Sequence, residues 1–183
     1  MADISITTAS NPRAAAAAAE SAPEIGEPYF DLIELLFFAY RDFVGDPDEV
    51  QAKLGFGRAH HRVLHFVNRN PGMKVADLLD VLKITKQSLG RVLKQLIDDG
   101  YVLQKAGAND RRQRLLYVSA EGEALAMQLA GLQTARIAGV LAELGPGARE
   151  AARRFLAGMI DAEDRERVLR LIARADVQSN GRD

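Results

Sequence analysis

Residues 75–102 read VADLLDVLKITKQSLGRVLKQLIDDGYV, and this stretch decides the fold. In its second half, apolar residues recur at the spacing of one helix face. They are Leu89, Val92, Leu93, Leu96 and Ile97. Thr85 stands at the N-cap of this helix and Gly100 at its end, where both residue types are favoured. A shorter helix over residues 76–83 comes first, so the stretch predicts two helices joined by a tight turn.

The other face of the second helix is rich in hydrogen-bond donors. These positions are Lys86, Gln87, Ser88, Arg91 and Lys94, with Thr85 just before them. Gly90 lies on the same face, although glycine costs roughly 1 kcal/mol relative to alanine in a helix interior. That cost suits a close approach of the backbone to DNA, whose major groove is about 12 Å wide and accepts one helix. The sequence therefore predicts a recognition helix.

Residues 107–114 read GANDRRQR and lie between two β-prone runs, at 101–106 and 114–119. Gly107, Asn109 and Asp110 supply the turn of a hairpin. Three arginines are not needed for the turn: Arg111, Arg112 and Arg114. We expect the hairpin to be a wing whose arginines enter the DNA minor groove, where negative potential is concentrated. Asp110 is expected to brace one arginine by a charge-assisted pair.

The distribution of charge supports a polyanionic partner. The whole chain has a net charge of −1. Residues 57–117 hold twelve Lys and Arg against five Asp and Glu, which leaves this segment at +7 and the remainder at −8. A basic helix or a basic hairpin alone is often only a solvated surface. Both together in a basic segment favour double-stranded DNA as the partner.

The chain is predicted to be mainly α, with a winged helix-turn-helix lobe that combines helices with a β wing. Beyond the residues already described, helices are expected at 29–45, 57–72, 120–143 and 147–174, with a connector at 46–57. Ser119 is expected to cap the helix at 120–143. The predicted organisation comprises a disordered low-complexity tail at 1–27, an N-terminal dimerisation helix and connector at 28–56, a DNA-binding lobe at 57–118, C-terminal dimerisation helices at 119–174 and a flexible tail at 175–183.

The helices outside the lobe carry more apolar surface than one small lobe can cover, and exposed patches of that size are unusual on a monomer. The sequence therefore predicts a homodimer in which the N- and C-terminal helices form a dimerisation base. A twofold dimer sets two recognition helices about one DNA turn apart. Its operator should then be a near-palindrome with half-sites ~10 bp apart.

Residues 75–102, together with NDRRQRLLYVSAEG at 109–122, resemble the MarR family of bacterial transcription regulators. The most specific elements are the Asp-Arg-Arg of the wing, the Leu-Tyr-Val-Ser strand exit and the following Glu-Gly. The resemblance covers roughly residues 29–174. It implies a dimer whose first helix and last two helices intertwine and carry two winged-helix lobes. Lys83 departs from the pattern, because such motifs often place glycine in this turn.

Three histidines lie on one expected helix, and His61 and His65 have the i, i+4 spacing of two zinc ligands. No cysteine or nearby carboxylate completes a metal site, so structural or hydrogen-bonding roles are favoured for these two and for His60. The family resemblance implies a small anionic or aromatic effector between dimer base and lobe. Its candidate wall residues are Phe37, Tyr40, Arg41 and His61, although core packing is the favoured role of Phe37.

Other classes of function have little support in the sequence. The absence of cysteine excludes disulfides and thiol redox switches. No apolar run approaches the roughly 20 residues of a membrane helix. The alanine-rich start has no basic segment before it, which favours a low-complexity tail over a signal peptide. A cytoplasmic protein is therefore expected. No GxSxG motif, phosphate loop or acid/base carboxylate pair is present, so we expect neither an enzyme nor a cofactor nor a metal site.

Two alternatives stay open. One is a winged helix that serves only protein–protein contacts, which predicts no salt-dependent binding to DNA. The other is a histidine-based metal or ligand sensor without operator recognition of its own.

Overall fold

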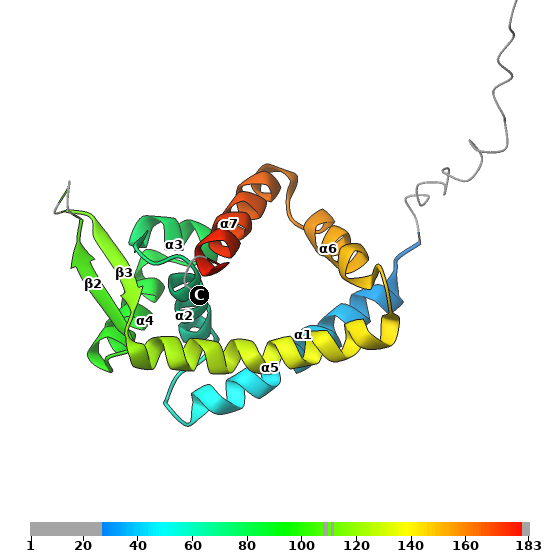
Figure 1. Ribbon diagram of the computed structural model, residues 1–183, viewed down its shortest axis with the longest axis horizontal. Helices are drawn as coiled ribbons and strands as arrows, with labels where there is room; N and C mark the ends of the chain where they lie inside the picture. Colours follow the sequence, from blue (N-terminus) through cyan, green and yellow to red (C-terminus); the bar gives the residue numbers. More distant parts are fainter. Residues whose placement is uncertain (1–26, 108–109, 111, 181–183) are drawn as a thin grey trace, which may run out of the picture. The chain divides into compact units, whose positions relative to one another are not determined.

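The computed structural model describes residues 27–107, 110 and 112–180 (Figure 1). The chain divides into two compact units, residues 1–38 and 39–183. The described part of the first unit carries the start of helix α1 (Phe30–Ala52). Its large apolar side chains are exposed: Tyr29, Phe30, Leu32, Ile33, Leu35, Leu36, Phe37 and Phe38.

The second unit contains a winged helix-turn-helix. Helices α2 (Arg58–Arg69), α3 (Val75–Leu82) and α4 (Lys86–Asp98) come first. Strands β1 (Met73–Lys74), β2 (Val102–Ala106) and β3 (Arg114–Val118) form an antiparallel sheet in the order β1-β3-β2. Helices α5 (Ala120–Leu144), α6 (Ala148–Gly158) and α7 (Ala162–Asn180) follow. The mainly helical winged-helix fold predicted from the sequence is confirmed.

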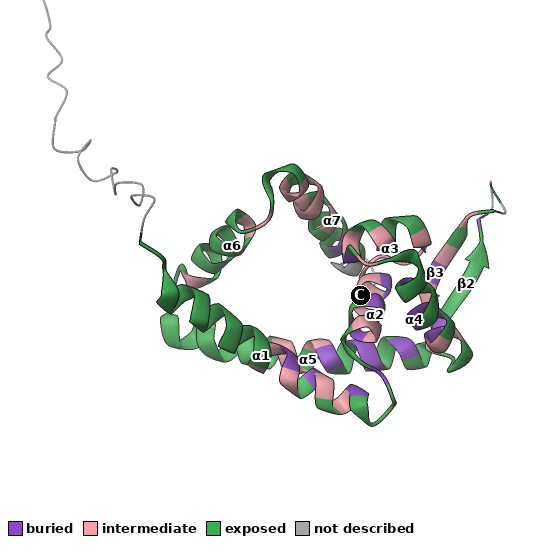
Figure 2. Ribbon diagram, turned by 180° about the vertical axis from the view of Figure 1, so that it is seen from behind, coloured by how far each residue is buried: buried purple, intermediate pink, exposed green. Residues whose placement is uncertain are grey.

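One hydrophobic core holds this lobe together. Its fully buried side chains include Leu64 of α2, Leu78 of α3, Leu89 of α4 and Leu116 of β3. The start of α5 completes the core with Leu125 and Leu129. Figure 2 shows the buried residues gathered in α2, α4 and the nearby half of α5. Burial of this continuous apolar set fixes the positions of α4 and the hairpin.

Local capping defines where the key helices begin. The Oγ1 atom of Thr85 accepts a hydrogen bond of 3.1 Å from the backbone N–H of Ser88, and Ser119 caps α5 through Gly122 at 3.0 Å. Both predicted caps are confirmed. Gly122 is required by packing, because an added Cβ atom would lie 2.0 Å from the carbonyl oxygen of Tyr101.

Helix α1 continues through the segment expected to be a connector. It reaches Ala52 and includes Pro47, whose carbonyl accepts a hydrogen bond of 3.1 Å from Gln51 Nε2. Pro47 and Gln51 are both fully buried. The packing of these two side chains outweighs the low helix propensity of proline. A local sequence pattern shows that propensity but not the packing, so it predicted a connector here.

The C-terminal helical segment differs from the sequence prediction in two ways. It divides into α6 and α7, and the guanidinium of Arg165 donates to the carbonyls of Gly158 and Ile160 at the break. In addition, α7 continues to Asn180, so residues 175–180 are helical where a flexible tail was expected. Ala175 is buried and Asp176 pairs with Arg69, which anchors this last part of the helix. The expected tails at 1–26 and 181–183 lie outside the described residues.

Among the described residues, the buried residues of helix α5 all lie in its first half. Beyond Leu129 most of its apolar side chains are exposed, among them Ile137, Val140 and Leu144. Among the described residues it is the one helix long and apolar enough, by length and composition alone, to cross a membrane.

Candidate nucleic-acid interface

Helix α4 presents a polar stripe opposite its buried face. Leu89, Val92, Leu93 and Leu96 are buried, which fixes the rotation of the helix about its axis. Gln87, Arg91 and Lys94 then follow one another at i, i+4 and i+7 on the outside, with Gly90 between them. All four are exposed.

The side chains of this stripe differ in what they contact. Within the described part of the chain, Gln87 and Arg91 form no hydrogen bond or ion pair. Lys94 pairs with Asp98 one turn further on, and the hydrogen bond that its ammonium donates to this carboxylate raises the pKa of the ammonium. Apart from the helix's own backbone and the chain neighbours of Gly90, no atom of the described residues lies within 4 Å of a Cβ added to Gly90. The first turns of α4 are thus open to a partner.

The residues at the start of α4 organise the helix terminus. Besides its cap, the hydroxyl of Thr85 donates to the Oγ atom of Ser88 at 2.9 Å. Lys86 is exposed in the first turn. Lys83, two residues before Thr85, has a backbone φ of 51° and forms the C-cap of α3. The family motif often has glycine at this position, whereas this sequence has lysine. The backbone nevertheless keeps the left-handed conformation that glycine would favour.

The wing is held by its backbone. The N–H of Gly107 donates to the carbonyl of Gln113, and that of Gln113 donates to the carbonyl of Asp110, each at 3.0 Å. A carboxylate oxygen of Asp110 accepts from the backbone N–H of Arg112 at 2.9 Å. Asp110 therefore shapes the turn, and its ion pair with an arginine side chain stays a prediction. Arg112 and Arg114 are exposed, and Arg111 lies outside the described residues.

The position of α4 against α2 is set partly by His60. Its Nδ1 atom accepts a hydrogen bond of 3.1 Å from the N–H of Gly57, so Nε2 carries the proton and donates to Gln95 Oε1 at 2.9 Å. The ring also stacks on Phe56, with centroids 4.9 Å apart. No local sequence pattern indicates this link, because Gln95 lies 35 residues further along the chain.

A second site lies between the end of α1 and α2, away from α4. It is a cavity of about 530 Å³ that is lined by Tyr40, Phe43, Val44, Arg58, His61, Arg62, His65, Phe66 and Gln133. Of the four predicted effector residues, Tyr40 and His61 line it. Arg41 instead pairs with Asp42 at 2.7 Å. Phe37 belongs to the first unit and is 68% exposed, so the core packing favoured for it is not found in this chain.

Burial disfavours the charged forms of the two histidines of this cavity. Burial lowers the pKa of His61, against the opposing effect of the nearby Asp48 carboxylate. Burial also lowers the pKa of His65, and the neighbouring charges of His61 and Arg69 add to the shift. Among the described residues, no three His, Asp or Glu side chains come together to hold a metal.

Comparison with known proteins identifies the class. A sequence profile of the MarR family matches residues 54–113. The HTH-type transcriptional regulator PetP of Rhodobacter capsulatus is 45% identical over 129 residues, which is 70% of this chain and 78% of that protein. The chain belongs to the MarR family of transcription regulators, and the resemblance seen in the sequence is confirmed.

Solved structures share the fold. FabT of Streptococcus pneumoniae in complex with DNA matches with a TM-score of 0.64 and 12% identity, over 72% of this chain and 94% of that one. A MarR family protein of Mycobacterium tuberculosis in complex with salicylic acid matches with a TM-score of 0.52 and 25% identity, over 74% of this chain and 98% of that one.

Proposed function

We propose that this chain is a cytoplasmic homodimer that binds a near-palindromic operator, with α4 in the major groove and the wing in the adjacent minor groove. The observation that carries the proposal is the exposed stripe of α4. Gln87 and Arg91 have no partner within the described chain, while the opposite face of the helix is anchored in the core. Base recognition requires hydrogen-bond donors that the protein does not already use, on a helix whose orientation is fixed.

The predicted DNA-binding residues divide into two roles. Gln87 and Arg91 are one turn apart and would read adjacent bases, because amide and guanidinium groups bind base edges in bidentate fashion. The others would contact phosphates or the minor groove, where they position the protein without reading sequence. They are Thr85, Lys86, Ser88, Lys94, Arg111, Arg112 and Arg114, with Asp110 shaping the wing.

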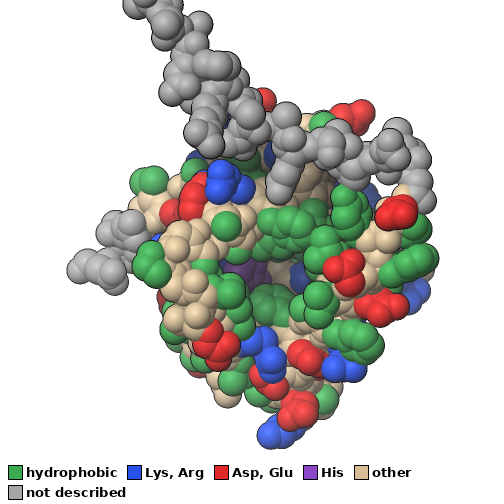
Figure 3. Space-filling view, turned by 90° about the vertical axis from the view of Figure 1, so that its right-hand side faces the viewer, with side chains coloured by type: hydrophobic (Ala, Val, Ile, Leu, Met, Phe, Trp, Pro, Cys, Tyr) green, Lys and Arg blue, Asp and Glu red, His purple; other side chains and the backbone are tan. Residues whose placement is uncertain are grey.

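Exposed apolar surface supports the dimer. On α5, Ile137, Val140 and Leu144 are 49%, 51% and 67% exposed, and on α6 Phe155 and Leu156 are 56% and 59% exposed. Figure 3 shows hydrophobic side chains at the surface among acidic and basic groups. A second copy would cover these faces of α5 and α6 and the apolar start of α1. The same contact would account for the exposed apolar stripe of α5 without a membrane.

A small effector is the finer part of the proposal. The cavity beside Tyr40 and His61 combines aromatic rings with the cationic side chains of Arg58 and Arg62. That lining suits a small aromatic or anionic molecule. The relative from Mycobacterium tuberculosis was solved with salicylic acid, and we extend this class of ligand to the present chain. We assign the protein no catalytic role.

The test begins with DNA selected by the protein from a random pool, followed by fluorescence anisotropy on the selected and a scrambled duplex. We expect a strong preference for the selected duplex. Gln87→Ala and Arg91→Ala should each reduce that preference by about 1–3 kcal/mol per lost bidentate contact. Equal loss on both duplexes would make these residues phosphate contacts, and no binding to either would favour the protein-interaction alternative.

Equilibrium sedimentation at micromolar concentration tests the dimer. We expect twice the chain mass of 20.0 kDa. A folded monomer at this concentration would rule out the dimer and the near-palindromic operator with it.

A further inference from the structure

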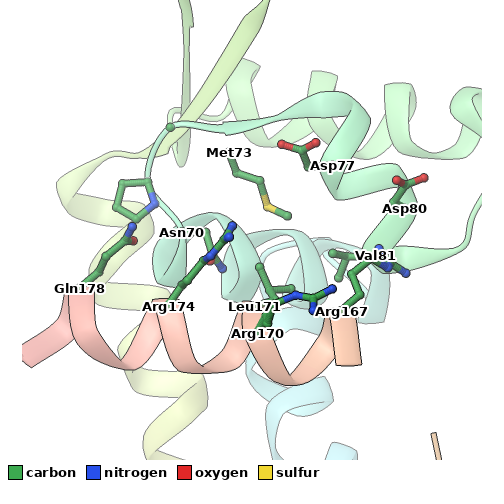
Figure 4. A pocket seen from close by; sticks show the side chains of 12 residues that line it. Asn70, Met73, Asp77, Asp80, Val81, Arg167, Arg170, Leu171, Arg174 and Gln178 are labelled. Carbon is green, nitrogen blue, oxygen red and sulfur yellow. The ribbon is translucent and has the colours of Figure 1, made fainter. Parts of the chain in front are cut away.

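A second cleft lies between α3 and α7, and it shares no lining residue with the cavity beside Tyr40. It has a volume of about 500 Å³. Figure 4 shows that side chains of α7 form one wall and side chains of α3 the other, with the segment before β1 closing one end. The family resemblance and the proposed function assign nothing to it.

The two walls carry opposite charges. Arg167, Arg170 and Arg174 line the α7 side, and Asp77 and Asp80 line the α3 side (Figure 4). In the described part of the chain, no ion pair joins the two walls. The cleft therefore presents cationic groups on one wall and anionic groups on the other.

The arginines differ in how far they are already engaged. Arg167 pairs with Asp164 at 2.7 Å, and Arg170 pairs with Glu166 on its own helix. Arg174 forms no hydrogen bond or ion pair with any described residue. The hydrogen bond to Asp164 is the main cause of the raised pKa of Arg167, and the negative charge of Asp80 adds to it. The negative charge on the α3 wall therefore stabilises the protonated form of an arginine on the α7 wall.

Apolar side chains lie between the charged walls. Met73 is only 7% exposed, and Figure 4 shows its side chain extending into the space between α3 and α7. Val81 and Leu171 add to this apolar surface. A ligand that fits would therefore combine both charges with an apolar part.

We propose that this cleft binds a small zwitterion of the amino-acid class with an apolar side chain. The carboxylate would be held by Arg170 and Arg174, because a guanidinium matches the geometry of a carboxylate. The ammonium would be held by Asp77 and Asp80, and the side chain would pack on Met73. A simple anion would leave the two aspartates without a cationic partner, and a simple cation would be repelled by the three arginines.

Isothermal titration calorimetry on the full chain tests the proposal with L-leucine, L-methionine and L-phenylalanine. We expect saturable binding of at least one. For L-leucine the matched probes are 4-methylpentanoate, which lacks the ammonium, and 3-methylbutylamine, which lacks the carboxylate. Each should bind at least about tenfold more weakly than the zwitterion, since one set of charge-assisted hydrogen bonds is lost. For another bound amino acid, the corresponding acid and amine take their place.

Variants locate the site. Arg174→Gln and Asp77→Asn should each weaken binding about tenfold, while Arg149→Gln on α6 should leave it unchanged. All three changed residues are exposed, so thermal unfolding should match the wild type. The proposal is overturned if none of the three amino acids binds, if the carboxylate alone binds as tightly as the zwitterion, or if the cleft variants behave like Arg149→Gln.

Discussion

Lys83 Nζ lies 3.2 Å from Oδ2 of Asp164, and this ion pair joins the turn of the helix-turn-helix to the first turn of α7. Asp164 also accepts from Arg167, and the hydrogen bonds from Arg167 and Lys83 lower the pKa of its carboxyl group. Among the described residues, Lys83 is the one non-glycine with a positive φ. A single residue thus combines an unfavourable backbone conformation with a contact between distant parts of the chain.

The backbone cost at Lys83 can be measured with two variants that both remove the ammonium. Lys83→Gly should be more stable than Lys83→Ala by about 1 kcal/mol, because the left-handed conformation is sterically unfavourable for alanine and not for glycine. Urea unfolding gives the two free energies. Equal midpoints with equal slopes would show that the turn relaxes away from this conformation.

Gly122 and Gly131 on α5 form a matched pair. Gly122→Ala should destabilise the protein by roughly 1–3 kcal/mol, because the new methyl group would overlap the carbonyl of Tyr101. Gly131→Ala meets open space, so it should be neutral or stabilise by up to about 1 kcal/mol. Thermal and urea unfolding compare them, and similar effects of both changes would contradict the close approach at Gly122.

Gly90 should separate stability from DNA binding. Gly90→Ala should stabilise α4 by up to about 1 kcal/mol, since the described residues outside the helix leave open space for the methyl group. If the backbone approaches DNA there, the same change should weaken binding to the selected duplex. Unfolding and anisotropy are measured on one preparation. Gain of stability with unchanged affinity would place Gly90 outside the interface.

Arg112 tests the wing. Arg112→Ala should weaken DNA binding without unfolding the protein, because the side chain is exposed and the turn is held by backbone hydrogen bonds. Each lost phosphate contact should lower the slope of log K against log salt by roughly 1. Arg149→Ala on α6 serves as the control. Identical salt slopes in all three proteins would remove Arg112 from the interface.

The cavity histidines predict a pH dependence. Burial lowers the pKa of His61 and His65 in the folded state, so the unfolded chain binds protons more readily. The free energy of unfolding should therefore fall as the pH drops below the ordinary histidine value of 6.5. Urea unfolding at pH values from about 7.5 to about 5 measures it. His61→Gln should reduce the slope of the unfolding free energy against pH. An unchanged slope in this variant would contradict a lowered pKa of His61.

The sequence alone determined the features that depend on neighbouring residues. The apolar spacing of Leu89, Val92, Leu93 and Leu96 predicted α4 and, by exclusion, its polar stripe. Thr85 and Ser119 predicted the starts of two helices. These predictions succeed because helix periodicity and capping act within one or two turns of the chain.

Tertiary structure decided whatever depends on residues far apart in sequence. The burial of Pro47 and Gln51 extends α1, and the contact of Asp176 with Arg69 extends α7. The bond from His60 to Gln95, the Lys83–Asp164 pair and the charged cleft between α3 and α7 each join segments that no local pattern relates. Their energies come from burial and charge pairing across the fold, which outweigh local propensity and exist only once the core has formed.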